Sequence, residues 1–366
     1  MRSKLTPPAT VVVKVGSSSI TNAGGGVDAE SIGRIVQQVA TVRSRGHDVV
    51  LVTSGAVAAG LPALGTQDRP TDIAGLQAAA AVGQGRLMES YTRAFSHHGL
   101  VTGQVLLTKD VLGNRQQYIN ARQTLDRLSE LGAVPIVNEN DTVVVDELRI
   151  GDNDRLAAIV SHMVGAELLV ILTDTPGLYG SDPRIDPGAE LLAAVRHTDK
   201  VLDEIRTAAK AGRFGTGGVA TKIAAAQIAA WSGIPTIIAG AHDEGTVVRA
   251  VDGETVGTWI EPRDHGLTAR KLWIAFGAPS EGRITIDAGA TRALSQGGGS
   301  LLSVGVLSVD GGFLDGAAVE IADTAGAFVG KGITMRDAVA IAEIAGKATA
   351  AGGGPVVHRD DLVVLA

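Results

Sequence analysis

The sequence contains no cysteine, and aromatic residues make up only 3% of its 366 residues. Without cysteine there is no disulfide scaffold, no thiol nucleophile and no thiolate metal site. The scarcity of aromatic rings argues against a surface on which nucleic-acid bases stack. A formal net charge of -7 argues against unselective binding to nucleic acid or to an anionic membrane. We therefore expect small molecules as partners.

Long uninterrupted apolar runs are also missing. Residues 49–67 and 223–242 are uncharged and approach the length of a membrane span. The first stretch contains three glycines and a proline, and the second is divided by a Ser-Gly-Ile-Pro sequence at residues 232–235. Residues 1–10 do not have the pattern of a signal peptide. We expect a cytoplasmic protein that does not associate with membranes.

The length favours two domains, and a hydrophobic content of 45% is sufficient for packed cores. Short apolar, β-branched runs alternate with segments of helical periodicity, an arrangement typical of βαβ units with parallel strands buried on both faces. These runs are residues 11–15, 49–53, 101–107, 134–137, 168–173 and 236–239. The pattern predicts an α/β sandwich from residue 11 to about residue 262.

The composition changes near residue 277, where glycine becomes denser and the apolar runs become short and alternating. We expect strands at 282–287, 301–308 and 317–321, and the sequence Asp310-Gly311-Gly312 is typical of a hairpin turn. The predicted division is a first domain over 1–265, a connecting segment over 266–277, and a small, mostly β domain over 278–366.

Residues that follow the predicted strands are candidates for ligand contact, because ligands of such sheets lie beyond the carboxyl ends of the strands. Lys14 lies inside the first strand and is followed by Gly16. A lysine in a doubly buried strand is costly unless an anion meets it, and a phosphate would remove that cost. The alternative is a lysine at the edge of the sheet that extends to solvent.

The second strand ends in a run of small residues, 53–60, that includes Ser54 and two glycines. Such a turn allows a ligand to approach the backbone, although a tight strand-to-helix turn requires small residues as well. Two acidic and amide-rich clusters follow, at 138–143 and 151–155. They are richer in Asp, Asn and Glu than one helix cap requires, so they are candidates for binding a substrate ammonium or a metal-nucleotide.

A glycine-rich segment at 215–218 leads through Thr221 and Lys222 into a strong helical pattern. It is not a Walker A loop, but a lysine in the first turn of a helix opposes the helix dipole unless an anion also lies there. The alternative is a flexible loop with a solvated lysine. The fifth strand ends in an acidic turn within residues 172–184, which is a further candidate for ligand contact. The alternative is a long surface loop.

Taken as an ordered set, these motifs resemble the glutamate-phosphorylating branch of the amino-acid-kinase family over almost the whole chain. The matching segments are 14–18, 54–60, 104–108, 114–115, Tyr118, Asn120, 138–143, 151–154, 173–174, 177–179, 217–218 and 221–222. The tail resembles a PUA domain. The resemblance implies a three-layer αβα sandwich with a mostly parallel sheet, followed by a small barrel-like β domain.

The resemblance also implies a reaction, in which ATP phosphorylates the γ-carboxylate of L-glutamate to L-glutamyl 5-phosphate, with Mg²⁺ as cofactor, in the first step of proline biosynthesis. By resemblance, the catalytic residues are Lys14, Lys222 and Asp154, with Asp154 orienting the lysines, and the glutamate-binding residues are Ser54, Asp141 and Asn153. The implied ATP-binding residues are Lys14, Gly16, Thr173, Asp174, Thr216, Gly217, Gly218, Val219, Ala220, Thr221 and Lys222. No metal ligand is assigned to the protein. A homo-oligomer, dimer or tetramer, and feedback inhibition by proline are further implications.

Two other functions remain open at this stage. One is another carboxylate kinase of the same fold, acting on N-acetylglutamate or aspartate, and Asp141 argues against the first because an acetylated amine needs no acidic partner. The other is binding or modification of RNA through the tail. From residue 277 onward the chain has six Lys or Arg against ten Asp or Glu, and RNA affinity normally needs a basic surface.

Overall fold

The computed structural model describes residues 2–22, 26–66, 68–108, 111, 114–143, 152–210 and 218–365. The chain divides into two compact units, Met1–Gly266 and Leu267–Ala366. The expected boundaries at 265 and 278 stay a prediction. Residues within the expected connecting segment form helical turns that contact strands of the second unit.

The described part of the first unit is built around a mixed sheet of eight strands in the order β3-β4-β2-β1-β5-β7-β8-β6. Its strands are β1 Thr10–Val15, β2 Asp48–Val52, β3 Thr102–Leu107, β4 Val134–Glu139, β5 Leu168–Thr173, β6 Ala194–Arg196, β7 Thr236–Gly240 and β8 Thr258–Glu261. The pairs are parallel except for β7 with β8. The predicted mostly parallel sheet is therefore confirmed.

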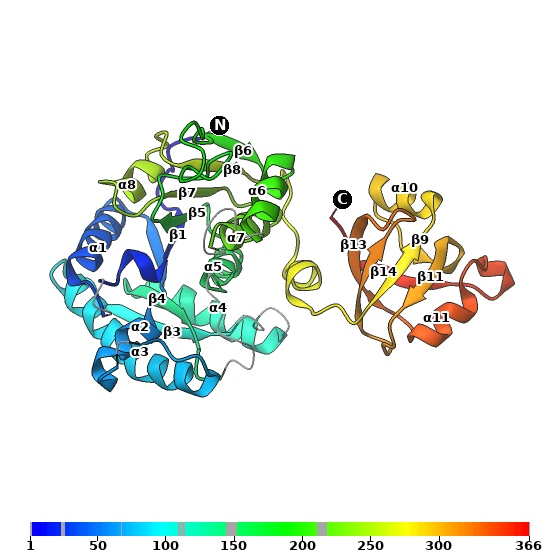
Figure 1. Ribbon diagram of the computed structural model, residues 1–366, viewed down its shortest axis with the longest axis horizontal. Coiled ribbons are helices and arrows are strands. Elements are labelled where there is room, and N and C mark those ends of the chain that lie inside the picture. Colours follow the sequence, from blue (N-terminus) through cyan, green and yellow to red (C-terminus); the bar gives the residue numbers. More distant parts are fainter. Residues whose placement is uncertain are drawn as a thin grey trace. The chain divides into compact units, whose positions relative to one another are not determined.

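Helices cover both faces of this sheet, which lies between them as the middle layer (Figure 1). They are α1 Ala29–Ser44, α2 Ala56–Gly60, α3 Ile73–Ser96, α4 Arg115–Glu130, α5 Asp152–Met163, α6 Lys200–Lys210, α7 Gly218–Trp231 and α8 Thr246–Val251. Contacts of α1 with α3 and α8 form one layer, and contacts of α7 with α5 and α6 form the other. The three-layer arrangement matches the expectation.

Central strands match the predicted apolar runs because both of their faces are buried. All residues of β4, β5 and β7 are buried, and so is β1 after its first residue. The run at 101–107 departs from this rule. It forms β3 at the edge of the sheet, where its burial is partial and Val101 is 71% exposed. The sequence pattern did not reveal β6 or β8.

The second unit contains a curled sheet of six described strands in the order β10-β14-β13-β12-β9-β11 (Figure 1). Its strands are β9 Gly282–Ile286, β10 Leu301–Leu302, β11 Val306–Asp310, β12 Ala318–Ala322, β13 Phe328–Thr334 and β14 Pro355–Val364. Its helices are α9 Ala269–Leu272, the π-helical η4 Trp273–Gly277, α10 Ala288–Gln296 and α11 Ala338–Ile344. Register shifts in four of its strand pairs are irregularities of the kind that bend a sheet.

The expected hairpin at Asp310-Gly311-Gly312 is wrong. The chain bends there, at Gly311 with a φ of +104°, but β11 pairs with β9 and β12 lies on the other side of β9. Phe313, which follows the turn, is buried in the core of this unit and leads the chain away from β11. The expected strand at 301–308 is also interrupted, by a 3-10 turn at Ser303–Gly305.

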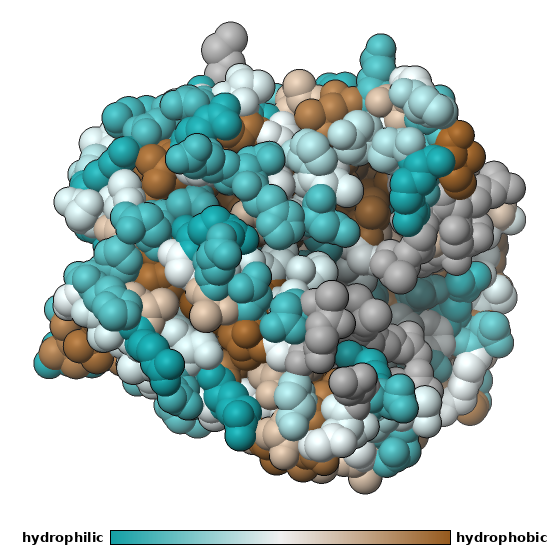
Figure 2. Space-filling model, turned by 60° about the vertical axis from the view of Figure 1, so that its left-hand side comes forward, coloured by the Kyte–Doolittle hydropathy of each residue, from teal (hydrophilic) through white to brown (hydrophobic). Residues whose placement is uncertain are grey.

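No helix in the described part of the chain is long and apolar enough to cross a membrane. The face drawn in Figure 2 is mainly hydrophilic, and hydrophobic residues appear on it in small separate groups.

Candidate functional site

The strand order reverses direction at β1. The chain moves from β1 to β2 on one side and later crosses to β5 on the other, so a crevice opens at the carboxyl ends of β1 and β5. A cavity of about 490 Å³ lies at this position. Lys14 and Gly16 at the end of β1, and Thr173 and Asp174 at the end of β5, line it.

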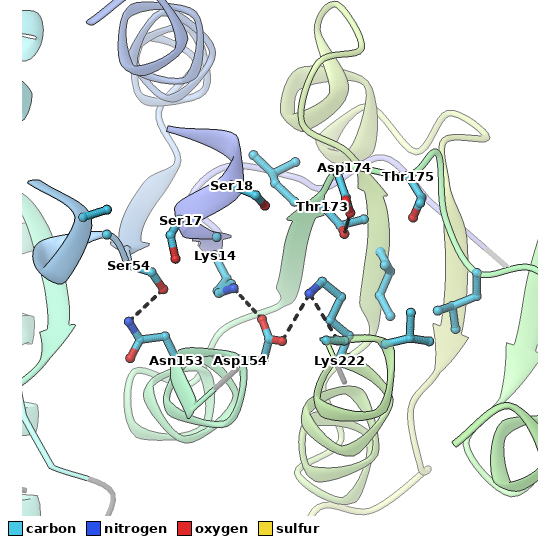
Figure 3. A pocket seen from close by; sticks show the side chains of 18 of the residues that line it. Lys14, Ser17, Ser18, Ser54, Asn153, Asp154, Thr173, Asp174, Thr175 and Lys222 are labelled. Atoms are coloured by element: carbon cyan, nitrogen blue, oxygen red, sulfur yellow. Dashed lines mark hydrogen bonds and ion pairs between the residues drawn. The ribbon is translucent and has the colours of Figure 1, made fainter. Parts of the chain in front are cut away.

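Two lysines meet one carboxylate in this cavity. The Nζ atom of Lys14 lies 2.6 Å from Oδ1 of Asp154, and the Nζ atom of Lys222 lies 3.5 Å from Oδ2 of the same residue. Figure 3 shows both lysines directed toward Asp154, which stands on α5. The hydroxyl of Thr221 donates to Oδ2 at 2.8 Å. The sequence places these groups far apart, and the sheet brings them together.

Lys14 is not an edge lysine. Only 3% of the residue is exposed and its strand is central, so the alternative of a solvent-directed side chain is wrong. Burial lowers the pKa of Lys14, Asp154 opposes that change, and the charge of Lys222 adds to it. Burial alone would raise the pKa of Asp154, but the two lysine charges and the hydrogen bonds from Lys14 and Thr221 lower it. With both lysines protonated and Asp154 ionised, the three groups together carry one excess positive charge.

Lys222 lies slightly deeper in its helix than expected. The helix α7 begins at Gly218, so Lys222 begins the second turn and donates to the carbonyl of Gly218 at 3.2 Å. Gly218, Val219 and Lys222 line the cavity. The predicted ATP-binding residues Thr216 and Gly217 lie outside the described residues, whereas Ala220 lies in the first turn without lining the cavity.

The other end of the cavity holds the three residues implied for glutamate. The amide nitrogen of Asn153, in the first turn of α5, lies within hydrogen-bonding distance of three oxygens, the Thr53 carbonyl at 2.5 Å, Oδ1 of Asn138 at 2.8 Å and the Ser54 hydroxyl at 2.9 Å. The buried amide oxygen of Asn153 has no hydrogen-bond partner in the described part of the chain. Asp141, in the turn after β4, also lines the cavity. Asn153 is therefore more than a helix cap.

Glycines after β2 serve two different purposes. Gly55 has a φ of +100° and lets the chain turn at the cavity wall. Gly60, by contrast, lies against α3. A Cβ atom there would come within 2.0 Å of the Ala79 carbonyl oxygen, and one at Gly83 within 1.8 Å of the Ala56 carbonyl oxygen. Of the two roles open for the small residues at 53–60, Gly60 therefore has the structural one, which is close packing against a neighbouring helix.

The cavity wall beyond the end of β5 combines polar and apolar groups. The Thr173 hydroxyl donates to Asp174 at 3.0 Å, and the side chains of Leu178, Val219 and Ile238 add apolar surface. This wall suits a ligand with an apolar part and several polar atoms.

Sequence reasoning missed several residues of the cavity. Arg69 lines it, and Asp182 and Arg184 line it from the excursion after β5. That excursion is not a plain surface loop, because Asp182 is only 6% exposed and forms an ion pair with Arg184 at 2.6 Å. The position of the excursion beyond a central strand was the signal available in the sequence.

Among the described residues, no group of three or more His, Asp or Glu side chains is arranged to hold a metal ion. The cations of Lys14 and Lys222 make the centre of the cavity suitable for phosphate oxygens. A divalent ion that enters already bound to those oxygens fits this set of residues.

Comparisons with known proteins agree for both units. The model of the amino acid kinase family matches residues 9–240, and that of the PUA domain matches residues 282–351. A solved structure, carbamate kinase from Giardia lamblia bound to AMP-PNP, aligns with a TM-score of 0.51 at 16% identity. The alignment covers 70% of this chain and 99% of that one, and it supports the fold of the first unit.

Relatives of similar length carry one name. The chain is 43% identical over 373 residues to the glutamate 5-kinase of Marinomonas sp. (strain MWYL1), and 45% identical over 372 residues to that of Azoarcus sp. (strain BH72). Both alignments cover 100% of each chain. The glutamate 5-kinase of Streptomyces coelicolor (strain ATCC BAA-471 / A3(2) / M145) is 46% identical, with 97% of this chain and 96% of the relative covered.

Proposed function

Because this chain belongs to the amino acid kinase family, we propose that it is a glutamate 5-kinase, which phosphorylates the γ-carboxylate of L-glutamate with ATP. The products are L-glutamyl 5-phosphate and ADP, and the reaction is the first step of proline biosynthesis. The observation that carries the proposal is the group of Lys14, Asp154 and Lys222, which lies between a nucleotide-facing wall and a cluster suited to an amino acid.

The chemistry fits the groups present. A γ-carboxylate oxygen of glutamate attacks the γ-phosphorus of ATP, and the bond from that phosphorus to the bridging oxygen breaks, so that ADP leaves with the electron pair. The attacking carboxylate is already ionised near neutral pH, so no residue has to remove a proton from it. The absence of cysteine in the sequence is compatible with this direct transfer.

Charge neutralisation is the main task of the protein in this reaction, because the transfer brings two anionic reactants together. We assign Lys14 and Lys222 to the transferring phosphoryl group and the adjacent phosphate oxygens. Asp154 holds the two ammonium groups in place against their mutual repulsion. Mg²⁺ neutralises further phosphate charge when it is bound to the nucleotide.

The nucleotide contacts follow from the same arrangement. We assign ATP to Gly16, Thr173 and Asp174 and to the segment 216–222, with the apolar groups of the wall against the base. This orientation directs the γ-phosphate toward Lys14 and Lys222.

Glutamate would occupy the opposite end. We assign its α-ammonium group to Asp141 and to the unpartnered oxygen of Asn153, with the Ser54 hydroxyl beside them. An ammonium group donates three hydrogen bonds, and acceptor oxygens are the groups it requires. The γ-carboxylate then extends toward the lysines.

A hydroxamate assay tests this proposal, because hydroxylamine traps an acyl phosphate as it forms. Glutamate, N-acetylglutamate and aspartate are compared side by side with ATP and Mg²⁺. We expect ATP-dependent hydroxamate mainly from glutamate. Higher kcat/KM for N-acetylglutamate or aspartate would show that the substrate assignment is wrong.

Further properties complete the proposal. We expect the reaction to take place in the cytoplasm, the protein to assemble as a dimer or tetramer, and proline to inhibit it, as the family resemblance implies. We also propose residues 1–265 as the catalytic domain, 278–366 as the PUA domain, and 266–277 as the connecting segment. The PUA match at 282–351 lies within the proposed second domain.

A further inference from the structure

Gln84 lies outside the cavity but is connected to it by hydrogen bonds. Its Oε1 atom accepts a hydrogen bond from Nδ2 of Asn138 at 2.7 Å. Oδ1 of Asn138 in turn accepts from the Asn153 amide at 2.8 Å, and the same amide nitrogen lies 2.5 Å from the Thr53 carbonyl oxygen and 2.9 Å from the Ser54 hydroxyl. This series of hydrogen bonds thus runs from α3 through the end of β4 and the start of α5 to the end of β2.

The bond from Gln84 determines which end of the Asn138 side chain faces the cavity. Asn138 is 2% exposed, so both ends of its amide must find partners inside the protein. With Nδ2 held by Gln84, Oδ1 is directed to Asn153 and to the backbone N–H of Glu139, 2.9 Å away. If the Asn138 amide were reversed, its NH₂ group would face the NH₂ group of Asn153, and the hydrogen bond between the two side chains would be lost.

Gln84 uses only one end of its own amide. Its Nε2 atom is buried and has no hydrogen-bond partner among the residues that the structure describes. A buried donor without a partner costs about 1–3 kcal/mol. The glutamine therefore contributes through its oxygen, the atom that holds Asn138.

The backbone fixes the place from which Gln84 acts. The neighbouring Gly83 brings α3 so close to α2 that a Cβ atom would lie 1.8 Å from the Ala56 carbonyl oxygen. Ala56, Val57 and Leu61 of the α2 region are buried against residues of α3. Because α2 starts two residues after Ser54, this packing fixes Gln84 and Ser54 relative to each other.

We propose that Gln84 is a positioning residue for glutamate, acting through Asn138 to hold the amide of Asn153 in the orientation that binds the substrate. The proposal rests on the proposed function, because it assigns Asn153 to glutamate. It predicts a selective effect. Loss of the Gln84 oxygen weakens glutamate binding, whereas the nucleotide contacts on the other side of Lys14 are unaffected.

The test compares Gln84→Met, which removes the acceptor at similar volume, with Gln84→Glu, which keeps it. We expect Gln84→Met to raise the KM for glutamate roughly fivefold to tenfold, in line with the loss of one internal hydrogen bond. The KM for ATP and kcat should change less than twofold. Gln84→Glu should stay within about threefold of the wild type, and Gln37→Met, at an exposed glutamine of α1, should change nothing.

A double-mutant cycle separates this role from a general effect on folding. In an Asn138→Ala background the connection is already broken, so adding Gln84→Met should change the KM for glutamate less than twofold. A full fivefold effect in that background would overturn the proposal. An unchanged KM for glutamate in Gln84→Met, or equal increases in both KM values, would overturn it as well.

Two further outcomes are decisive. If the Gln84→Met variant does not fold, Gln84→Leu is used in its place. If neither variant folds while Gln84→Glu binds glutamate normally, Gln84 is required for folding and the proposal is wrong. If the wild type itself gives no hydroxamate with glutamate, it is the proposed function that fails. If the wild type phosphorylates glutamate and the Gln84→Met variant has the same KM for glutamate, only the role of Gln84 is contradicted.

Discussion

Replacing Asp154 by asparagine should destabilise the protein because it leaves Lys14 buried without a counter-charge. Removing one partner of a buried ion pair typically costs about 3–5 kcal/mol. Lys14 can limit that cost by releasing its proton. From its ordinary pKa of 10.5, deprotonation at pH 7.5 costs about 4 kcal/mol, and at pH 9.5 about 1.4 kcal/mol. Since Lys14 is 3% exposed, solvent screens little of this cost.

The pH dependence has a defined sign. In the variant the folded protein holds Lys14 neutral, while the unfolded chain binds its proton at any pH below about 10.5. The unfolded state therefore binds more protons, and the stability of the variant rises with pH. The deficit relative to the wild type should be largest near neutral pH and should shrink as the pH approaches 10.5.

Thermal unfolding measures this effect. We expect the melting temperature of Asp154→Asn to fall by about 10 °C at pH 7.5 and by about 4 °C at pH 9.5. AMP-PNP with Mg²⁺ should raise the melting temperature of the variant more than that of the wild type, because the phosphates replace the lost carboxylate.

Asp252 provides the matched control. It also bridges two cations, Lys4 at 2.9 Å and Arg45 at 2.7 Å, but its side chain is 22% exposed. We expect Asp252→Asn to cost about 1 kcal/mol or less. An Asp154→Asn variant that melts within 2 °C of the wild type at pH 7.5, or that shows the same deficit at both pH values, would refute this reasoning about burial.

Three further predictions concern activity and packing. Lys14→Ala and Lys222→Ala should each lower kcat about 100-fold or more in the hydroxamate assay, with a smaller change in the KM for glutamate, and unchanged rates would contradict their assignment to the phosphates. Asp141→Asn should raise the KM for glutamate about tenfold and leave the KM for ATP unchanged, as initial-rate measurements would show, and equal changes in both would contradict its role. Gly83→Ala should destabilise the protein by about 3 kcal/mol in thermal unfolding, because its Cβ would collide with the Ala56 carbonyl. Gly85→Ala on the same helix, where an added Cβ meets nothing within 4 Å, should not, and equal melting temperatures for the two variants would exclude the collision.

The sequence predicts the central strands well because a parallel sheet requires continuous apolar residues on both faces. The strands β1, β2, β4, β5 and β7 all coincide with such runs to within two residues. The strand β6 has three residues, and only the middle one is buried, so it has no pattern that distinguishes it from a loop. The glycines at 311 and 312 mark a bend, but a bend does not determine which strand its neighbours pair with.

Candidate site residues could be found from their place after strands, but their partners could not. The pattern marks Lys14 as a buried cation that needs an anion, yet nothing local identifies Asp154 as that anion. Gln84 lies in an ordinary helical pattern, and its importance depends on contact with a residue more than fifty positions away. Gly60 is a glycine whose position after a strand indicates a ligand although it packs against a helix, because the sequence pattern of small residues is the same in both cases.

The group of Lys14, Asp154 and Lys222 also bears on how the chain folds during synthesis. Lys14 leaves the ribosome early, while its partner Asp154 and the neighbouring strand β5 follow about 140 residues later, which takes about 7–28 s at ordinary rates of synthesis. During that interval β1 can pair with β2, but its other side lacks β5 and the charge of Lys14 lacks Asp154. The strand that completes the burial of β1 and the carboxylate that neutralises Lys14 thus become available close together in synthesis, so an active centre indicates that β1 lies between both of its neighbours.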